Sequence, residues 1–316
     1  MITASKSIMR RSLIAVLFSL ALVGNCIAQT DRAVMVREAV LYLNPDTTSN
    51  KLGRATRGRE IAVLEHSRGF VKVLVSTGEG AGVTGWIVDK GLVRTSTPNG
   101  DKILFGEGAD SEAEASRAHG RRGSAQDAMR LYYRMAEYFP TSPLAGEAMW
   151  RAADIRWQVE KDDASTRPSY KAPDPSSRPQ LEEQYLHEVE KKFPNTKWSD
   201  QAAYNKLDNK MCGDWQGLPK CPEKESELYE KYVKDHPNSP KAAEALYEAA
   251  RRQAALVEIY KGMNEEAKST AARNHAIQLC RSIGNQSASS VDMATRAARL
   301  LYMMEQGITV YASTIE

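Results

Sequence analysis

Apolar residues recur at helical spacing in three similar stretches of the chain, each centred on a proline. The stretches align on Pro140, Pro194 and Pro237. They share an apolar residue five positions before the proline, a hydroxyl two after it, an alanine eight after it and an aromatic ring ten after it. These positions hold Met135, Val189 and Tyr232; Ser142, Thr196 and Ser239; Ala148, Ala202 and Ala245; and Trp150, Tyr204 and Tyr247.

Each stretch predicts two helices joined by a turn. Proline lacks an amide hydrogen and clashes with the preceding turn, so a first helix is expected to end just before it. The hydroxyl residue that follows is expected to cap a second helix, with Pro143 and Pro240 at its first position in two of the copies. A single pair leaves its apolar side open to water, so we expect the pairs to stack into a solenoid.

The repeated stretches resemble tetratricopeptide-like repeats, in particular those of two bacterial periplasmic proteins, the outer-membrane assembly lipoprotein and the periplasmic partner of the Tol–Pal system. The resemblance covers residues 124–262, and its middle copy departs from the pattern at Ser199 and Leu207. It implies a helical fold that binds proteins, but it does not specify the partner. The residues that carry it are Tyr138, Pro140, Ser142, Ala145, Ala148, Trp150 and Ala153 in the first copy and Pro237, Ser239, Ala242, Ala245, Tyr247 and Ala250 in the third.

Residues 33–94 carry a different pattern, in which short apolar runs are separated by turn residues. Side-chain polarity alternates over residues 58–75, and Ser67 to Gly69 interrupt the alternation. This predicts a β-hairpin. Five or six short strands in about 60 residues predict a small barrel.

The same region resembles the bacterial SH3-like family, whose members often bind cell-wall peptides or proteins, or act as spacers beside a catalytic domain. On this resemblance, Trp86, Tyr42 and Phe70 are the candidate ligand-binding side chains. The alternative is that Trp86 belongs to the barrel core. Tyr42 and Phe70 stand where the family commonly has arginine and tryptophan. The matching positions are Val36, Ala39, Leu41, Pro45, Ser49, Leu52, Gly58, Ile61, Val63, Val71, Val73, Gly85, Trp86, Ile87 and Leu92.

Together these patterns predict an α+β multidomain protein, in which a small SH3-like β-barrel precedes an all-α tetratricopeptide-like solenoid. A fourth helix pair is expected after Tyr260, with Ser290 as its cap and Gly307 as its stop. A proline-rich insert at 162–180 is expected to be an extended loop. The expected parts are a signal peptide at 1–28, the barrel at 29–98, a linker with a short helix at 99–123 and the helical repeats at 124–316.

The first 28 residues have the composition of a secretory signal peptide. Three basic residues precede a short apolar run at residues 12–24, and the small residues Cys26 and Ala28 suit cleavage after Ala28. The alternatives are an uncleaved membrane anchor and a lipoprotein that carries its lipid on Cys26. We expect an exported protein of the periplasm or cell envelope, with no transmembrane span in the mature chain.

Charge argues against nucleic acid as a partner. The three basic residues of the signal segment account for the whole net charge of +3, so the rest of the chain is neutral. A neutral chain has no basic field that would hold a phosphate backbone.

Export makes disulfides possible, and three cysteines follow the signal segment. Cys212 and Cys221 flank a turn between two of the helical stretches, so we predict a disulfide between them. The alternative is a pair of free thiols. Cys280 is expected to be a small buried residue.

No catalytic or metal-binding motif stands out. The five histidines are scattered along the chain, and none has the spacing of a metal site. Phosphate-binding loops and the nucleophile motif of serine hydrolases are missing. A cell-wall cysteine peptidase needs a histidine after its cysteine, and none follows Cys280. We therefore expect no enzymatic activity, no metal and no cofactor.

Each first helix of a pair carries a polar stripe with i, i+4, i+7 spacing, so each stripe lies on one helix face. Such a face can contact a protein partner or simply be solvated. We expect a scaffold for interactions with envelope proteins, whose barrel contacts cell wall or protein. The alternative is a peptidoglycan-binding module or an accessory factor of a cell-wall hydrolase. The stripe residues are Arg130, Arg134, Glu137, Gln184, Glu188, Lys191, Glu227, Lys231 and Lys234.

Overall fold

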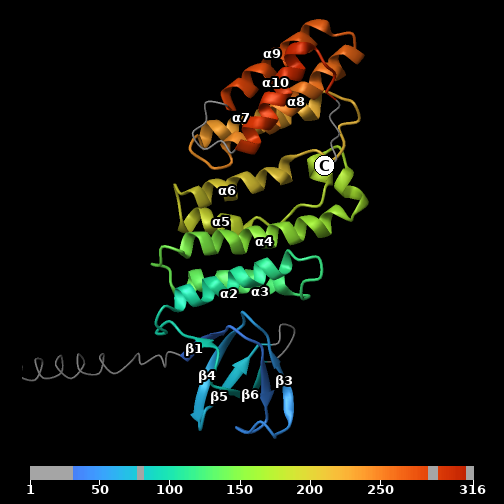
Figure 1. Cartoon of the computed structure of the whole chain (residues 1–316). Coiled ribbons are helices and arrows are strands. Elements are labelled where there is room, and N and C mark those ends of the chain that lie inside the picture. The colour runs from blue at the N-terminus through green and yellow to red at the C-terminus, as the bar shows by residue number, and fades with distance from the viewer. Residues whose placement is uncertain (1–30, 77–81, 284–290, 311–316) are drawn as a thin grey trace, which may run out of the picture. The chain divides into compact units, whose positions relative to one another are not determined.

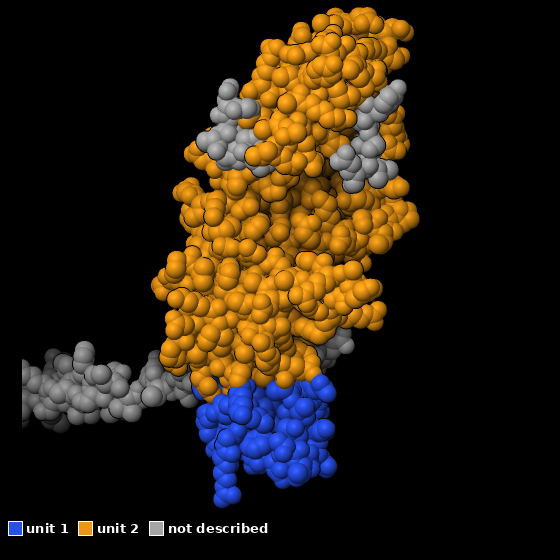
Figure 2. All heavy atoms as spheres, in the orientation of Figure 1, with its two compact units in different colours: residues 1–33, 39–55, 60–90 blue, residues 34–38, 56–59, 91–316 orange. Residues whose placement is uncertain are grey.

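The computed structural model describes residues 31–76, 82–283 and 291–310, which fall into two compact units (Figure 2). The expected signal peptide, with Cys26, lies outside the described residues, as does Ser290. The first unit takes in the described residues of 1–33, 39–55 and 60–90, and the second those of 34–38, 56–59 and 91–316.

The N-terminal strands form one antiparallel sheet of seven strands in the order β3-β2-β6-β5-β4-β1-β7. This order has two edges, β3 and β7, so the closed barrel that the sequence predicts is not confirmed. The predicted hairpin is present, and Ser67 pairs with Phe70 across its turn. The strands are β1 Asp31–Met35, β2 Ala39–Tyr42, β3 Lys51–Ala55, β4 Glu60–Ser67, β5 Phe70–Val75, β6 Val83–Val88 and β7 Leu92–Val93.

Side chains of the central strands alternate between two faces of the sheet, because successive residues of a strand point in opposite directions. In β5, Val71 and Val73 are fully buried, whereas Phe70 and Lys72 are only partly covered. Ile87 of β6 lies opposite Val71 and is also fully buried. One face therefore builds the core of the first unit, and the other face is more open to solvent.

The rest of the described chain holds nine α-helices and three short 3₁₀ helices (Figure 1). As predicted, α3, α5 and α7 each end two residues before a repeat proline. The elements are α2 Gly100–Ala115, α3 Ser124–Tyr138, α4 Ala145–Ser165, η1 Pro168–Lys171, η2 Pro175–Ser177, α5 Gln184–Lys192, α6 Lys197–Asn205, η3 Lys206–Lys210, α7 Lys220–Asp235, α8 Ala242–Gly262, α9 Glu266–Ile283 and α10 Val291–Gln306.

Helix starts follow the predicted capping in one copy and differ slightly in two. Thr196 caps α6 and forms a reciprocal capping box with Ser199. In the other copies, Ser142 and Ser239 accept hydrogen bonds from the amides two residues later, and α4 and α8 begin only after those turns. The two following prolines therefore lie in the turn and not at the first helical position.

Two further segments differ from their expected form. In place of a short helix within a linker, α2 is a 16-residue helix that packs against α3 and buries Leu104. The proline-rich insert is held in place, because Arg178 donates hydrogen bonds to the carbonyl oxygens of Asp208 and Met211 in and beside η3. The insert is therefore part of the packed helical unit.

Helices of the second unit pack in chain order, with η3 between α6 and α7. The alanines of the repeat pattern, Ala148, Ala202 and Ala245, are fully buried, so the predicted helical phase is confirmed. The aromatic positions are only half-buried. Across the residues with described coordinates, no helix is both long enough and apolar enough to cross a membrane.

Candidate binding surfaces

Three aromatic side chains lie on the more open face of the sheet. Trp86 of β6 pairs in register with Lys72 of β5 and with Tyr42 of β2, so these three side chains share one face. That face is opposite to the one that buries Val71 and Val73. Trp86 is nevertheless only 8% exposed, so it is one of the buried core side chains, as the alternative interpretation of the sequence expects.

Neighbouring side chains cover most of Trp86 and form a small cluster around it. The ammonium of Lys72 lies 5.8 Å from the centre of the Trp86 ring, a cation–π geometry. The rings of Tyr42 and Phe70 meet edge to face, with their centres 6.4 Å apart, and both are half-buried. We call Tyr42, Phe70, Lys72 and Trp86 the aromatic face. Tyr42 and Phe70 are its accessible rings, and Trp86 is its floor.

The chemistry of the aromatic face suits a ligand with an apolar or ring-shaped part and a nearby negative charge. Half-exposed tyrosine and phenylalanine rings offer large contact areas at low entropic cost. Lys72 is the cation of this face, and it also lies 3.8 Å from the Glu65 carboxylate. An exposed pair of this kind is weak, so Lys72 can turn toward a ligand.

The polar stripes of the helices are largely engaged in pairs of their own. Arg134 pairs with Glu137, and Lys231 with Asp235, within their own helices. Glu188 accepts from Lys192 one turn later. These i, i+3 and i, i+4 pairs are typical of solvated helix surfaces. The stripes therefore add little to the case for a binding site.

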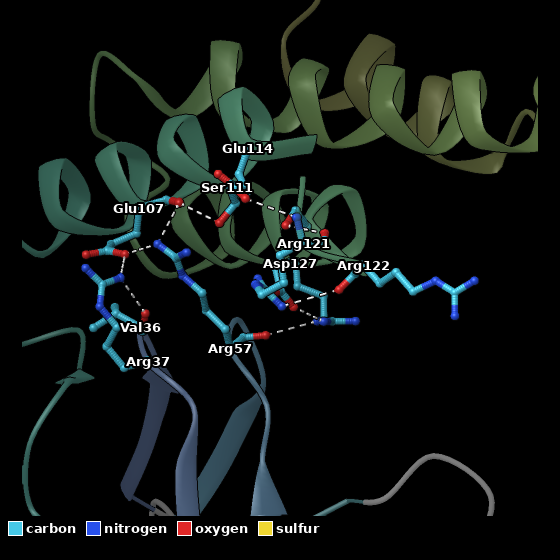
Figure 3. A network of polar contacts seen from close by, with 11 residues as sticks. Val36, Arg37, Arg57, Glu107, Ser111, Glu114, Arg121, Arg122 and Asp127 are labelled. Carbon is cyan, nitrogen blue, oxygen red and sulfur yellow. Dashed lines mark hydrogen bonds and ion pairs between the residues drawn. The ribbon is translucent and has the colours of Figure 1, made fainter. Parts of the chain in front are cut away.

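Arg130, the first stripe residue, has a structural role in a charged network (Figure 3). Its guanidinium pairs with Asp127, whose side chain is 5% exposed, and donates to the carbonyl oxygen of Arg57 at 3.2 Å. Arg121 contacts the other oxygen of the same carboxylate. The sequence suggests that Arg121 lies on a solvated face, but it helps to neutralise a buried charge.

A second carboxylate completes this network. The Glu107 carboxylate of α2 accepts hydrogen bonds from both Arg37 and Arg57. Arg57 also donates a hydrogen bond to the backbone carbonyl oxygen of Glu107, at 3.2 Å. Gly58 lies next to Arg57, and a Cβ on it would come within 2.7 Å of the Arg130 Cβ, so only glycine permits this close approach. The network fastens segments 34–38 and 56–59 to α2 and α3 within the second unit. It is built for stability and not for catalysis.

The sulfur atoms of Cys212 and Cys221 lie at disulfide distance, 2.15 Å apart, as the sequence predicts. The loop that they close is also held by the carboxylate of Glu225 in α7. This carboxylate accepts from the Cys212 amide at 2.9 Å and from the Trp215 indole at 3.2 Å. The sequence pattern gave no signal for Glu225, because a single glutamate inside a charged helix looks like a surface residue.

Cys280 is buried in α9, as expected. Burial raises the pKa of its thiol to about 12, so the thiol is neutral at physiological pH. The nearest histidine in sequence, His275, instead contacts Glu230 at 3.0 Å, and this hydrogen bond raises the histidine pKa. Among the residues that the structure describes, no group of three or more His, Cys, Asp or Glu side chains can hold a metal ion.

Comparisons with known proteins leave the chain without an assigned family. No protein-family model and no curated protein matches it. Two solved structures, named DHF79 filament and DHF119 filament, align at 17% and 16% identity. The first alignment covers 63% of this chain and 95% of that chain with a TM-score of 0.22, and the second covers 66% and 95% with a TM-score of 0.24. At these TM-scores the likeness carries no argument about fold or function.

Proposed function

We propose that this chain is an exported, non-enzymatic protein of the cell envelope that acts as a scaffold for protein–protein interactions. In this proposal the sheet is a bacterial SH3-like domain, and the helix pairs form a tetratricopeptide-like solenoid. The aromatic face carries the proposal, because it gathers the accessible rings of Tyr42 and Phe70 on the more open side of the sheet. The disulfide between Cys212 and Cys221 is consistent with export.

The partner of the aromatic face is proposed to be an envelope protein with an exposed apolar segment. Aromatic side chains dominate the energetics of protein interfaces. The helix pairs of the second unit supply the extended surface on which further proteins can assemble.

A second candidate is binding to peptidoglycan, which the position of Lys72 favours. The free carboxylates of cell-wall peptides can pair with this ammonium, while sugar or peptide groups pack on Tyr42 and Phe70. An accessory role beside a cell-wall hydrolase would use the same contact.

The test compares the two half-buried rings of the aromatic face with an exposed leucine of the second unit. Crosslinking in the native envelope should capture a defined protein with the unchanged chain and with Leu218→Ser, an exposed leucine of the second unit. The double variant Tyr42→Ser with Phe70→Ser should lose that product while its melting temperature stays close to that of the unchanged chain. Equal capture by all three proteins contradicts the proposal.

The same three proteins, together with Cys280→Ala, distinguish the other candidates. Sedimentation with purified peptidoglycan that depends on Tyr42 and Phe70 favours the cell-wall module. Release of soluble muropeptides that is lost on Cys280→Ala would make the chain a hydrolase and would overturn the non-enzymatic assignment.

A further inference from the structure

The last helix of the second unit, α10, leaves an apolar face uncovered. Val291 is 85% exposed and Tyr302 is 60% exposed. Ala294 and Ala298 are exposed between them. Positions i, i+3, i+7 and i+11 lie on one side of a helix, so these four residues form a single face. We call it the α10 face. Glu305, at i+14, borders this face at its C-terminal end and pairs with Arg281 of α9 at 2.8 Å.

Equivalent positions in two earlier helices are buried. The sequence Ala297-Ala298-Arg299 in α10 aligns with Ala249-Ala250-Arg251 in α8. In this alignment, the four residues of the α10 face correspond to four residues of α8. The alignment of the repeats on Pro140 and Pro237 relates these four α8 residues to four residues of α4. Every member of both earlier sets is buried; they are Ala243, Leu246, Ala250 and Ala254 in α8, and Gly146, Met149, Ala153 and Trp157 in α4.

These buried positions face the helices that follow in the chain. A Cβ on Gly146 would come within 2.7 Å of the Trp198 ring of α6, so α4 and α6 are in close contact there. The indole of Trp157 donates to Asp208 in η3 at 3.0 Å. On α8, the Val257 carbonyl, one turn beyond Ala254, accepts from Ser269 of α9 at 3.0 Å. The α10 face is thus equivalent to these docking surfaces, and no described helix covers it.

The opposite end of the same unit is closed. Val34, Val36 and Val93 belong to the same apolar cluster as Leu104 of α2. Arg37 and Arg57 pair with Glu107 on that helix (Figure 3). A second copy therefore has no open first helix to offer to the α10 face, and head-to-tail stacking of copies is blocked.

We propose that the α10 face binds the α10 face of a second copy of this chain, around a two-fold axis with the two helices antiparallel. In this arrangement Val291 of one copy packs beside Tyr302 of the other, and the alanines between them let the helices approach closely. The contact goes beyond the proposed scaffold function, because it would double each binding surface without using the aromatic face.

Charge selects the antiparallel orientation. Asp292 and Arg299 are seven residues apart and lie along the same flank of the α10 face. Asp292 also lies 3.0 Å from Arg296 of its own helix, but both side chains are exposed, so this pair is weak. Antiparallel pairing around a two-fold axis brings Asp292 of each copy next to Arg299 of the other. Parallel pairing around a two-fold axis would instead place the two flanks on opposite sides of the dimer, so that Asp292 and Arg299 form no pairs between the copies.

The first experiment measures mass in solution by sedimentation and light scattering, using the full chain as the cell processes it. The unchanged protein should be a dimer. Ala298→Arg, at an exposed position in the centre of the face, should raise the dimer dissociation constant about a hundredfold or more, because it sets two like charges against each other. Ala113→Arg, an exposed alanine of α2, is the matched control and should leave the dimer intact. A monomeric unchanged protein, including one that binds only a different partner, overturns the proposal.

The second experiment tests the orientation by exchanging charges. Asp292→Arg and Arg299→Asp should each weaken the dimer, since each leaves like charges facing one another. The double variant should restore it. Oxidation of a mixture of Val291→Cys and Tyr302→Cys proteins should link the two copies, whereas either variant alone should not be linked. Efficient linking of Val291→Cys to itself would show parallel helices and would contradict the antiparallel contact.

Discussion

The carboxylate of Glu225 in α7 lies 3.1 Å from Nε of Arg252 in α8 and is almost completely buried, with 2% of the residue exposed. It also accepts hydrogen bonds from the Cys212 amide and the Trp215 indole. A buried charge of this kind is tolerated because donors surround it. One carboxylate therefore joins two helices to the disulfide loop.

Removal of this carboxylate should destabilise the helical unit strongly. Glu225→Ala leaves the guanidinium of Arg252 without one of its partners, and we expect a loss of about 3–5 kcal/mol in the free energy of unfolding. Glu227→Ala, two residues later and exposed, is the control and should cost less than about 0.5 kcal/mol. Urea unfolding of both variants measures the difference, and similar midpoints would show that the Glu225 contacts contribute little.

The disulfide should stabilise the same region, because it reduces the conformational entropy of the unfolded chain. For the loop between Cys212 and Cys221, replacement of both cysteines by serine is expected to cost about 2–3 kcal/mol. Peptide mapping without reductant should find the two cysteines linked in the exported protein, with Cys280 free. Recovery of both as free thiols would contradict this prediction.

The buried thiol of Cys280 predicts a loss of stability in alkaline solution. Its pKa is raised from an ordinary value of 9.0 to about 12, because burial disfavours the thiolate. As the pH rises from about 9 toward about 12, the unfolded chain loses this proton while the folded chain keeps it, so folding becomes less favourable. The unchanged protein should therefore lose more stability across this range than Cys280→Ala does. If the free energy of unfolding falls equally with pH for both proteins, Cys280 is not shielded from water.

The repeat alanines should reject larger side chains. Ala245 is fully buried between helices, so Ala245→Leu should cost about 1–3 kcal/mol through overpacking. Ala113→Leu, at an exposed helical position, should change the melting temperature little. Tyr247 of the same repeat is only half-buried, so its removal should cost less than that of a fully buried ring. Equal melting temperatures for the two leucine variants would mean that the helical phase is wrong.

Local rules predicted the helix pairs well, because proline and small residues act within a few residues of where they stand. Pro140 and Pro237 mark the ends of α3 and α7, and Ala148 and Ala245 mark buried positions. Pro143 and Pro240 were expected at the first helical position, but α4 and α8 begin two residues after them, since the serine hydroxyls form a turn before each helix begins.

Long-range packing accounts for what the sequence did not reveal. The alternation along β6 does not tell which face is covered, so it cannot tell whether Trp86 belongs to the core or lies opposite to it. Glu225 looks like a surface charge in sequence, because its partner Arg252 comes from another helix. Asp127 does so too, because Arg121 comes from a preceding loop and the pair with Arg130, at i+3 in the same helix, is one that surface helices also form. The helix α2 is longer than the short helix expected within 99–123, and its packing against α3 is a contact that local sequence does not reveal.

Segments 34–38 and 56–59 have a consequence for modular exchange between proteins. They belong to the helical unit, and Arg37 and Arg57 meet Glu107 there. A recombination event that joined residues 29–98 to another protein would carry both arginines away from Glu107 and uncover Leu104. The junction that composition marks near residue 98 is therefore a poor site for shuffling, and the two parts are expected to be inherited together.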